Sequence, residues 1–166
     1  MNMIPHSLVP TARRDRLIVV VGAIAGAAIL LAITRGAASG RVVETDWRSA
    51  WLLVHLSSVL PALPLGGYLL WRRKGDPLHR MLGRCWGGLM MVAAVSSFGL
   101  HAQGRLSLIH LLSALVLVSI PRAILQARRH DIAGHRRTMS LTYLGLAIAG
   151  LFTLLPDRLL GSWLFG

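Results

Sequence analysis

The chain has 166 residues, of which 54% are hydrophobic and 14% are charged, and this is too apolar for a soluble domain of that length. The net charge of +12 does not indicate a nucleic-acid-binding protein, because the basic residues stand between long apolar runs and not along one face of a soluble fold. We therefore expect a single all-α integral membrane domain whose main partner is the lipid bilayer.

Five apolar stretches are candidates for membrane-spanning helices, each of which needs roughly 20 mostly apolar residues. Acidic residues are absent from all five, as the cost of burying a charge in the bilayer demands. We expect five transmembrane helices, over Leu17–Thr34, Ala50–Trp71, Met81–Leu100, Leu106–Ala127 and Met139–Pro156.

The first stretch has an alternative interpretation as a signal peptide, because Arg13-Arg14 precedes it and Ala37-Ala38-Ser39 resembles a cleavage site. Its apolar core is longer than is usual for a signal peptide, and Arg35 lies near the proposed cut. We therefore favour a retained helix.

The positions of Lys and Arg predict the orientation, since positively charged loops stay in the cytoplasm. Most of the 18 basic residues fall on one side of the membrane if the N-terminus is inside. We expect a bacterial inner-membrane protein with residues 1–16 in the cytoplasm and residues 157–166 in the periplasm. The five tryptophans lie near the expected interfaces and indicate an aromatic belt: Trp47, Trp51, Trp71, Trp86 and Trp163.

An internal repeat relates residues 50–100 to residues 106–156. In each unit a histidine begins a span that carries proline later and ends in a basic cluster. An aspartate and a His-Arg pair then follow, before the second span of the unit. The matching landmarks are His55 with His110, Asp76 with Asp131, and His79-Arg80 with His135-Arg136. Two tandem hairpins of this kind predict a four-helix bundle with a pseudo-twofold axis along the membrane normal, with the second span facing the fourth and the third facing the fifth. The first span, residues 17–34, has no counterpart and is expected at the periphery.

Four histidines are the candidate cofactor ligands. The symmetry places His55 and His110 at one depth near the outer surface, and His79 and His135 at the inner surface. Facing histidines on opposed helices can hold a haem iron from both sides. Small residues beside them would let a flat macrocycle or a neighbouring helix approach: Ser57, Ser58, Gly66, Gly67, Gly87, Gly88, Ser113 and Ala114.

Structural and other binding roles compete with haem ligation. Each histidine could be an interfacial residue with a hydrogen-bonded neighbour, and Asp76 and Asp131 could be helix N-caps. Arg80 and Arg136 could contact lipid phosphates, and Arg122 could reach the headgroups or a cofactor propionate. His101 could join His55 and His110 at a metal ion or a quinone oxygen.

Two loops carry a family resemblance. The segments DPLHRMLGR and DIAGHRRTM, with the repeated intramembrane histidine, resemble the bacterial membrane proteins of domain of unknown function 2306 over about Trp51 to Pro156. That resemblance implies a small polytopic protein and no established activity. His79-Arg-Met-Leu-Gly83 is also similar to the His-x-x-Leu-Gly element of the ascorbate-reducible dihaem b-type cytochromes, although the histidines here are closer in sequence.

The sequence thus favours a membrane redox protein that carries electrons with one or two b-type haems, with a quinone as a candidate partner. The alternative is a non-catalytic accessory or assembly subunit of a larger respiratory or photosynthetic complex. With Cys85 as the single cysteine, no internal disulfide or cysteine metal cluster can form.

Overall fold

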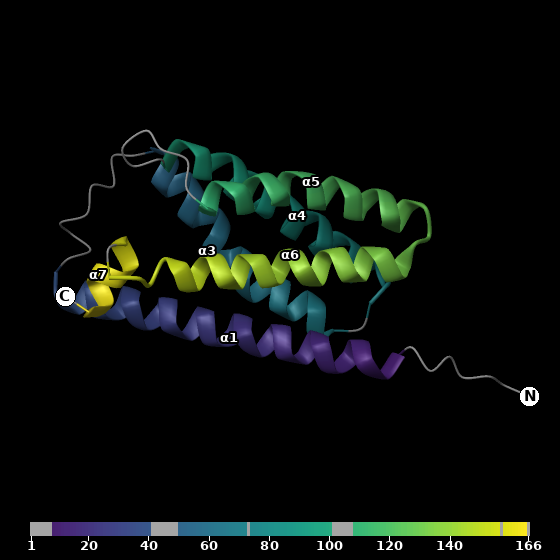
Figure 1. The fold of residues 1–166 in the computed structure, drawn as a ribbon, viewed down its shortest axis with the longest axis horizontal. Helices are drawn as coiled ribbons and strands as arrows, with labels where there is room; N and C mark the ends of the chain where they lie inside the picture. The colour runs from purple at the N-terminus through teal and green to yellow at the C-terminus, as the bar shows by residue number, and fades with distance from the viewer. Residues whose placement is uncertain (1–7, 41–49, 73, 101–107, 157, 166) are drawn as a thin grey trace, which may run out of the picture.

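The computed structural model describes residues 8–40, 50–72, 74–100, 108–156 and 158–165, and all regular elements within them are helical. Figure 1 shows long helices lying side by side, with one short helix at the end away from the N-terminus. The elements are α1 (Leu8–Ala38), α3 (Ala50–Trp71), α4 (Pro77–Ser97), the 3₁₀ turn η1 (Phe98–Leu100), α5 (Leu108–Arg128), α6 (Ile132–Phe152) and α7 (Leu159–Phe165).

Aspartate caps set the starts of α4 and α6. Asp76 accepts a hydrogen bond from the His79 backbone N–H at 2.7 Å, and Asp131 accepts one from the Gly134 N–H at 2.9 Å. Such caps satisfy backbone donors that the first helical turn leaves unpaired. The predicted caps are confirmed, and they start both helices before the apolar stretches begin.

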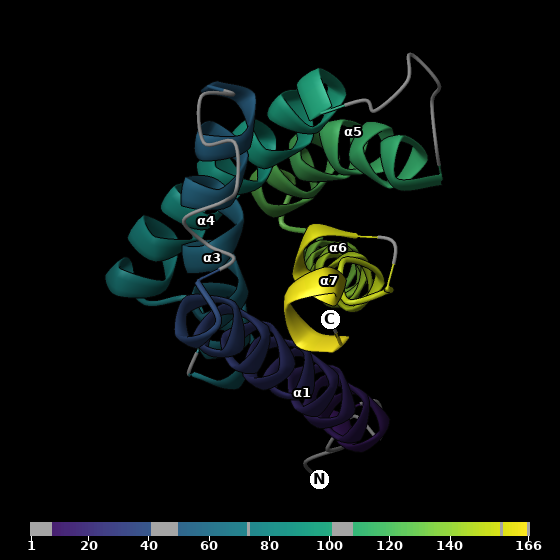
Figure 2. The same cartoon turned by 90° about the vertical axis from the view of Figure 1, so that its left-hand side faces the viewer.

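The helices of the two predicted hairpins pack in sequence order. Contacts are extensive between α3 and α4, between α4 and α5, and between α5 and α6, while α3 and α6 touch over a smaller area. In the end-on view of Figure 2, α1 lies beneath α3 and α6, and it packs against both. The four helices therefore form a bundle whose α3–α6 side is completed by α1.

Helix α1 has contacts with three other helices. It packs against α3, α6 and α7, and Ile18, Ala25, Ile29 and Ala32 on it are buried. Small residues permit this close packing, since a Cβ on Gly22 would overlap the Tyr143 hydroxyl oxygen. The helix without a counterpart in the repeat therefore packs against helices that are distant in sequence.

Two tryptophans contribute to the core. Trp86 and Trp163 are only 3% and 5% exposed, and the Trp86 indole N–H donates to the Ala62 carbonyl at 2.9 Å. The aromatic-belt interpretation is wrong for these two, because each fills space between helices. Trp51 and Trp71 are exposed, at 51% and 79%, as that interpretation expected.

Four helices in the described part of the chain are long and apolar enough to cross a membrane: Arg13–Ala38, Ala50–Trp71, Pro77–Leu100 and His110–Arg128. With 21 residues, α6 is as long as α4 and α5, but its first turns include His135, Arg136 and Arg137. The predicted fifth span began at Met139, after these charges, and ran to Pro156. Because α6 ends at Phe152 and not at Pro156, fewer apolar residues lie within the helix than predicted.

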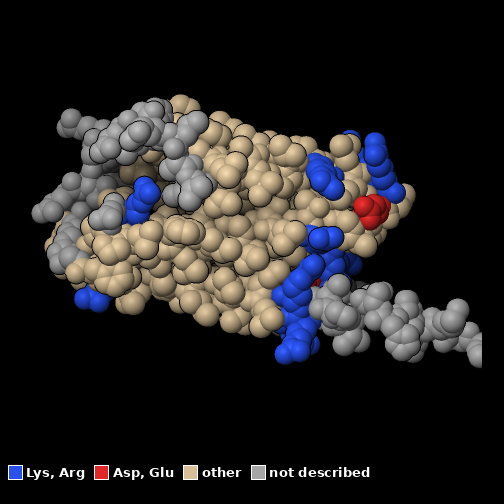
Figure 3. Space-filling model, in the orientation of Figure 1, with Lys and Arg blue, Asp and Glu red and all other residues tan. Residues whose placement is uncertain are grey.

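Charge is distributed unevenly between the two ends of the bundle. Figure 3 shows Lys and Arg side chains gathered where α1 begins and α5 turns into α6, with a broad uncharged surface beside them. We call this the basic end. The distribution is that of a protein with an apolar belt and one strongly cationic face, which suits a bilayer with anionic lipids.

Candidate functional site

His55 is held by the end of α4 that lies away from the basic end. Its Nδ1 lies 3.0 Å from the Ala93 carbonyl oxygen and 3.1 Å from Ser96 Oγ. A carbonyl can only accept, so Nδ1 carries the proton in its hydrogen bond to Ala93. This leaves Nε2 of His55 as the nitrogen that can accept a proton or bind a metal.

His110 rests on the same end of α4. It is 8% exposed, and its ring centroid lies 5.6 Å from that of Phe98, with the two planes tilted by 43°. One turn further along α5, Ser113 receives a hydrogen bond from the Ser97 hydroxyl at 2.6 Å. The two histidines predicted to form the outer pair therefore both pack against the end of α4.

The second histidine pair lies at the basic end. His135 Nδ1 lies 2.9 Å from the Ala123 carbonyl oxygen on α5, so this nitrogen is also the protonated one. His79 Nδ1 is buried without a hydrogen-bond partner in the described structure. The two imidazoles come from the first turns of α4 and α6, which both begin at the basic end.

The three arginines predicted to contact lipid or a propionate lie in different surroundings. Arg80 is exposed and donates to the Gly75 carbonyl at 3.1 Å, and Arg122 is exposed on α5. Arg136 donates its Nε and Nη2 to Asp15, at 2.8 and 2.6 Å. Arg136 therefore has fewer donors left for an external anion than the other two.

Asp15 is a buried charged residue that was not among the candidate site residues predicted from the sequence. Only 4% of it is exposed, and its Oδ1 accepts a hydrogen bond from Ser140 at 3.0 Å. Lys74 and Arg14 each lie 3.8 Å from its carboxylate. In the sequence, the one sign of such a role was that Asp15 stands among three arginines near the start of α1. Its partners on α6 and in the α3–α4 connection are too distant in sequence to be predicted from the spacing of residues.

The connection between α3 and α4 contains two perturbed groups. The hydrogen bond from the His79 N–H is the main cause that lowers the pKa of Asp76, and Arg72 assists. Burial lowers the pKa of Lys74, Arg136 lowers it further, and Asp15 partly offsets both. Both shifts follow from the dense packing of charges at the basic end.

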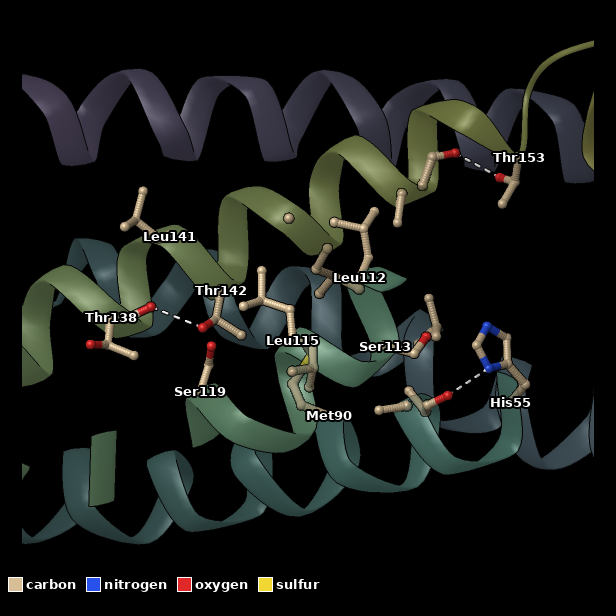
Figure 4. Close-up of a pocket in the computed structure, with 18 of the residues that line it drawn as sticks. His55, Met90, Leu112, Ser113, Leu115, Ser119, Thr138, Leu141, Thr142 and Thr153 are labelled. Atoms are coloured by element: carbon tan, nitrogen blue, oxygen red, sulfur yellow. Dashed lines mark hydrogen bonds between the residues drawn. The ribbon is translucent and has the colours of Figure 1, made fainter. Parts of the chain in front are cut away.

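A long groove runs through the bundle beside His55. Its volume is about 600 Å³, and its walls come mainly from α3, α4, α5 and α6. Figure 4 shows His55 near one end of this cavity and Thr138 toward the other, with Met90, Leu115 and Thr142 between them. His110 is not among the residues that line it, so the two outer histidines do not face a common cavity.

No group of three or more His, Cys, Asp or Glu side chains that could hold a metal ion occurs in the described parts of the chain. His101, the candidate third imidazole, falls outside the described residues.

The fold defines a small all-helical membrane protein with a basic end and a groove between its helices. Residues 52–160 match the family described as Predicted membrane protein (DUF2306), and the chain belongs to that family. The family resemblance predicted from the two His-Arg loops is thus confirmed. No curated protein and no solved structure matches the chain.

Proposed function

We propose that this chain is a membrane redox protein in which His79 and His135 hold the iron of a b-type haem at the basic end. The observation that carries the proposal is the pairing of these two histidines, one with an unsatisfied buried ring nitrogen. A buried polar atom without a partner is costly, and the cost is explained if the ring is a ligand to a bound group.

Two features near the pair support the proposal, while neither histidine lines the groove described above. The hydrogen bond from His135 Nδ1 to Ala123 fixes the ring and leaves Nε2 as the ligand atom. Metal-bound histidines usually donate their other ring nitrogen to a carbonyl or carboxylate in this way. One turn beyond His79 on α4 is Gly83, where a Cβ would meet no atom within 4 Å. A flat ring would have room to approach the helix at such a position, and the exposed Arg80 would be the proposed contact for a propionate.

The opposite end offers a weaker site for haem. His55 is oriented in the same way, by the Ala93 carbonyl, but it lines the groove alone among the described histidines. His110 packs on Phe98 instead. We therefore confine the haem proposal to the basic-end pair.

A haem whose iron is bound by a histidine on each side carries single electrons and does not bind oxygen. In this chain His79 and His135 would fix the iron, while Ala123 would hold His135 in the ligating tautomer. We further propose that α6 is a fifth span, since it matches α4 and α5 in length and lies between the same ends of the bundle. We also propose that the basic end faces the cytoplasm, because positively charged loops are retained there.

The test is a reduced-minus-oxidised visible spectrum of the purified protein, with pyridine extraction to count haem. We expect one haem per chain, lost in both His79→Ala and His135→Ala. His130→Asn is the matched control, because His130 is exposed, has a φ of 60° that asparagine tolerates, and belongs to neither pair. Folded protein without haem, or haem that survives both alanine substitutions, would refute the proposal.

A further inference from the structure

The groove beside His55 is shaped for an extended chain. Between Thr138 and Thr153, both of which line it, α6 rises roughly 22 Å, which is most of the depth of a hydrocarbon core of roughly 30 Å. Its walls are mainly apolar and include Leu112, Val116, Leu141 and Leu146. A cavity of about 600 Å³ with this length accommodates a hydrocarbon tail lying along the helices.

At the end of the groove nearest the α5–α6 turn, two arginines lie without an acidic residue in the lining. Arg122 from α5 and Arg137 from α6 line it near the α5–α6 turn, and its lining includes no Asp or Glu. Among the described residues neither arginine forms an ion pair, whereas the adjacent Arg136 is paired with Asp15. The charge at this end of the groove therefore favours an anionic group.

The Gln126 side chain adds a further donor at this end. Gln126 accepts the Thr138 hydroxyl through Oε1 at 2.9 Å, which leaves its amide NH₂ group as a donor at the groove. Arg122 lies six residues before the end of α5 at Arg128, or roughly 9 Å along the axis. Arg122 therefore begins inside the expected span, and its long side chain can extend toward the headgroups, where a lipid phosphate lies.

We propose that the groove binds one anionic phospholipid, with its phosphate between Arg122 and Arg137 and one acyl chain along α5 and α6 toward His55. Arginine suits this role because its planar group can donate two parallel hydrogen bonds to a phosphate. The site does not depend on the haem proposal, since it shares neither histidine of the basic-end pair. A long-chain quinone entering with its ring at His55 is the competing occupant.

Gly145 provides a way to block the groove. It lines the cavity, and a Cβ there would meet no atom within 4 Å, so Gly145→Leu places a side chain in the groove without a clash at its first carbon. Gly88 is the matched control, because it is equally open, lies inside α4, and does not line the groove. Both substitutions remove a helix-interior glycine, so their effects on helix stability are alike.

The experiment equilibrates the protein in mild detergent with equal amounts of phosphatidylglycerol, phosphatidylcholine with the same acyl chains, and a long-chain quinone, and counts retained molecules by native mass spectrometry. We expect one preferentially retained phosphatidylglycerol in the wild type and in Gly88→Leu. Gly145→Leu should lose it, with a melting temperature no lower than that of the wild type as the check on folding. Arg122→Gln and Arg137→Gln should each reduce the preference over phosphatidylcholine about fivefold, as expected for about 1 kcal/mol per basic residue.

Three results would overturn the inference. The first is equal retention of the two phospholipids by the wild type, and the second is retention of phosphatidylglycerol by folded Gly145→Leu. The third is retention of the quinone by the wild type together with its loss in Gly145→Leu. The last result would assign the groove to the quinone.

Discussion

Replacing Asp15 with asparagine should destabilise the protein more than the same replacement at Asp76 or Asp131. The Asp15 carboxylate is 4% exposed and receives two hydrogen bonds from Arg136 and one from Ser140. Removing one partner of a buried ion pair costs about 3–5 kcal/mol. Because 24% of the Arg136 side chain and 36% of the Lys74 side chain are exposed, solvent reduces the cost to about 2–3 kcal/mol.

The measurement is the melting temperature in detergent, which should fall by roughly 5–10 °C for a chain of this size. Asp131→Asn is the control, since it makes the same chemical change at an exposed cap where asparagine serves as well as aspartate. A double-mutant cycle with Arg136→Gln should show coupling between the two positions. If Asp15→Asn melts no lower than Asp131→Asn, the argument that this contact anchors α1 is refuted.

The pH dependence of the same variant provides a second test. The folded-state pKa of Lys74 lies below its ordinary value of 10.5, chiefly through burial and then through Arg136, while Asp15 raises it. A folded pKa below the unfolded one means that stability increases as the pH rises from the folded pKa toward 10.5. Loss of Asp15 lowers the folded pKa further, so melting temperatures measured between neutral and alkaline pH should rise more steeply in Asp15→Asn than in the wild type.

Other contacts give three further predictions. Gly66→Ala should destabilise by about 1–3 kcal/mol, because the new Cβ would lie 2.5 Å from two aromatic side chains, whereas Gly88→Ala should be neutral or stabilising in the same thermal assay. Ser97→Ala and Ser113→Ala should be coupled by about 0.6 kcal/mol in a double-mutant cycle of unfolding, and additive losses would contradict the shared hydrogen bond. The depressed pKa of Asp76 means that its contribution is lost as the pH falls through the folded pKa, so Asp76→Asn should flatten the acid limb of a melting-temperature profile, and an unchanged limb would contradict this.

The sequence predicted local features well, because they depend on neighbouring residues. The bounds of α3 were predicted as Ala50–Trp71, since polar or charged residues follow it directly. The two aspartate caps were also expected from their position before a helix. The starts of α4 and α6 were placed too late, because apolar content defines the membrane-embedded part of a helix and the cap defines its beginning.

Contacts between distant helices could not be predicted from spacing. Gly66 was interpreted as room for a macrocycle or a helix, and it in fact admits Trp86 and Tyr143. The symmetry argument placed His55 and His110 at one depth, but Ala93 and Phe98 decide where their rings point. The groove was missed because its lining residues are spread over several helices and only the packing brings them together.

The contact between Asp15 and Arg136 also has a consequence for biogenesis. The two residues are separated by 121 positions, so at a synthesis rate of about 5–20 residues per second the carboxylate emerges roughly 6–24 s before its partner. During that interval α1 is already in the bilayer while its binding surface on α6 does not yet exist. The contact between α1 and α6 therefore forms only after α6 has been made, although α3 can pack against α1 earlier. Whatever shields Asp15 in the meantime influences the yield of folded protein.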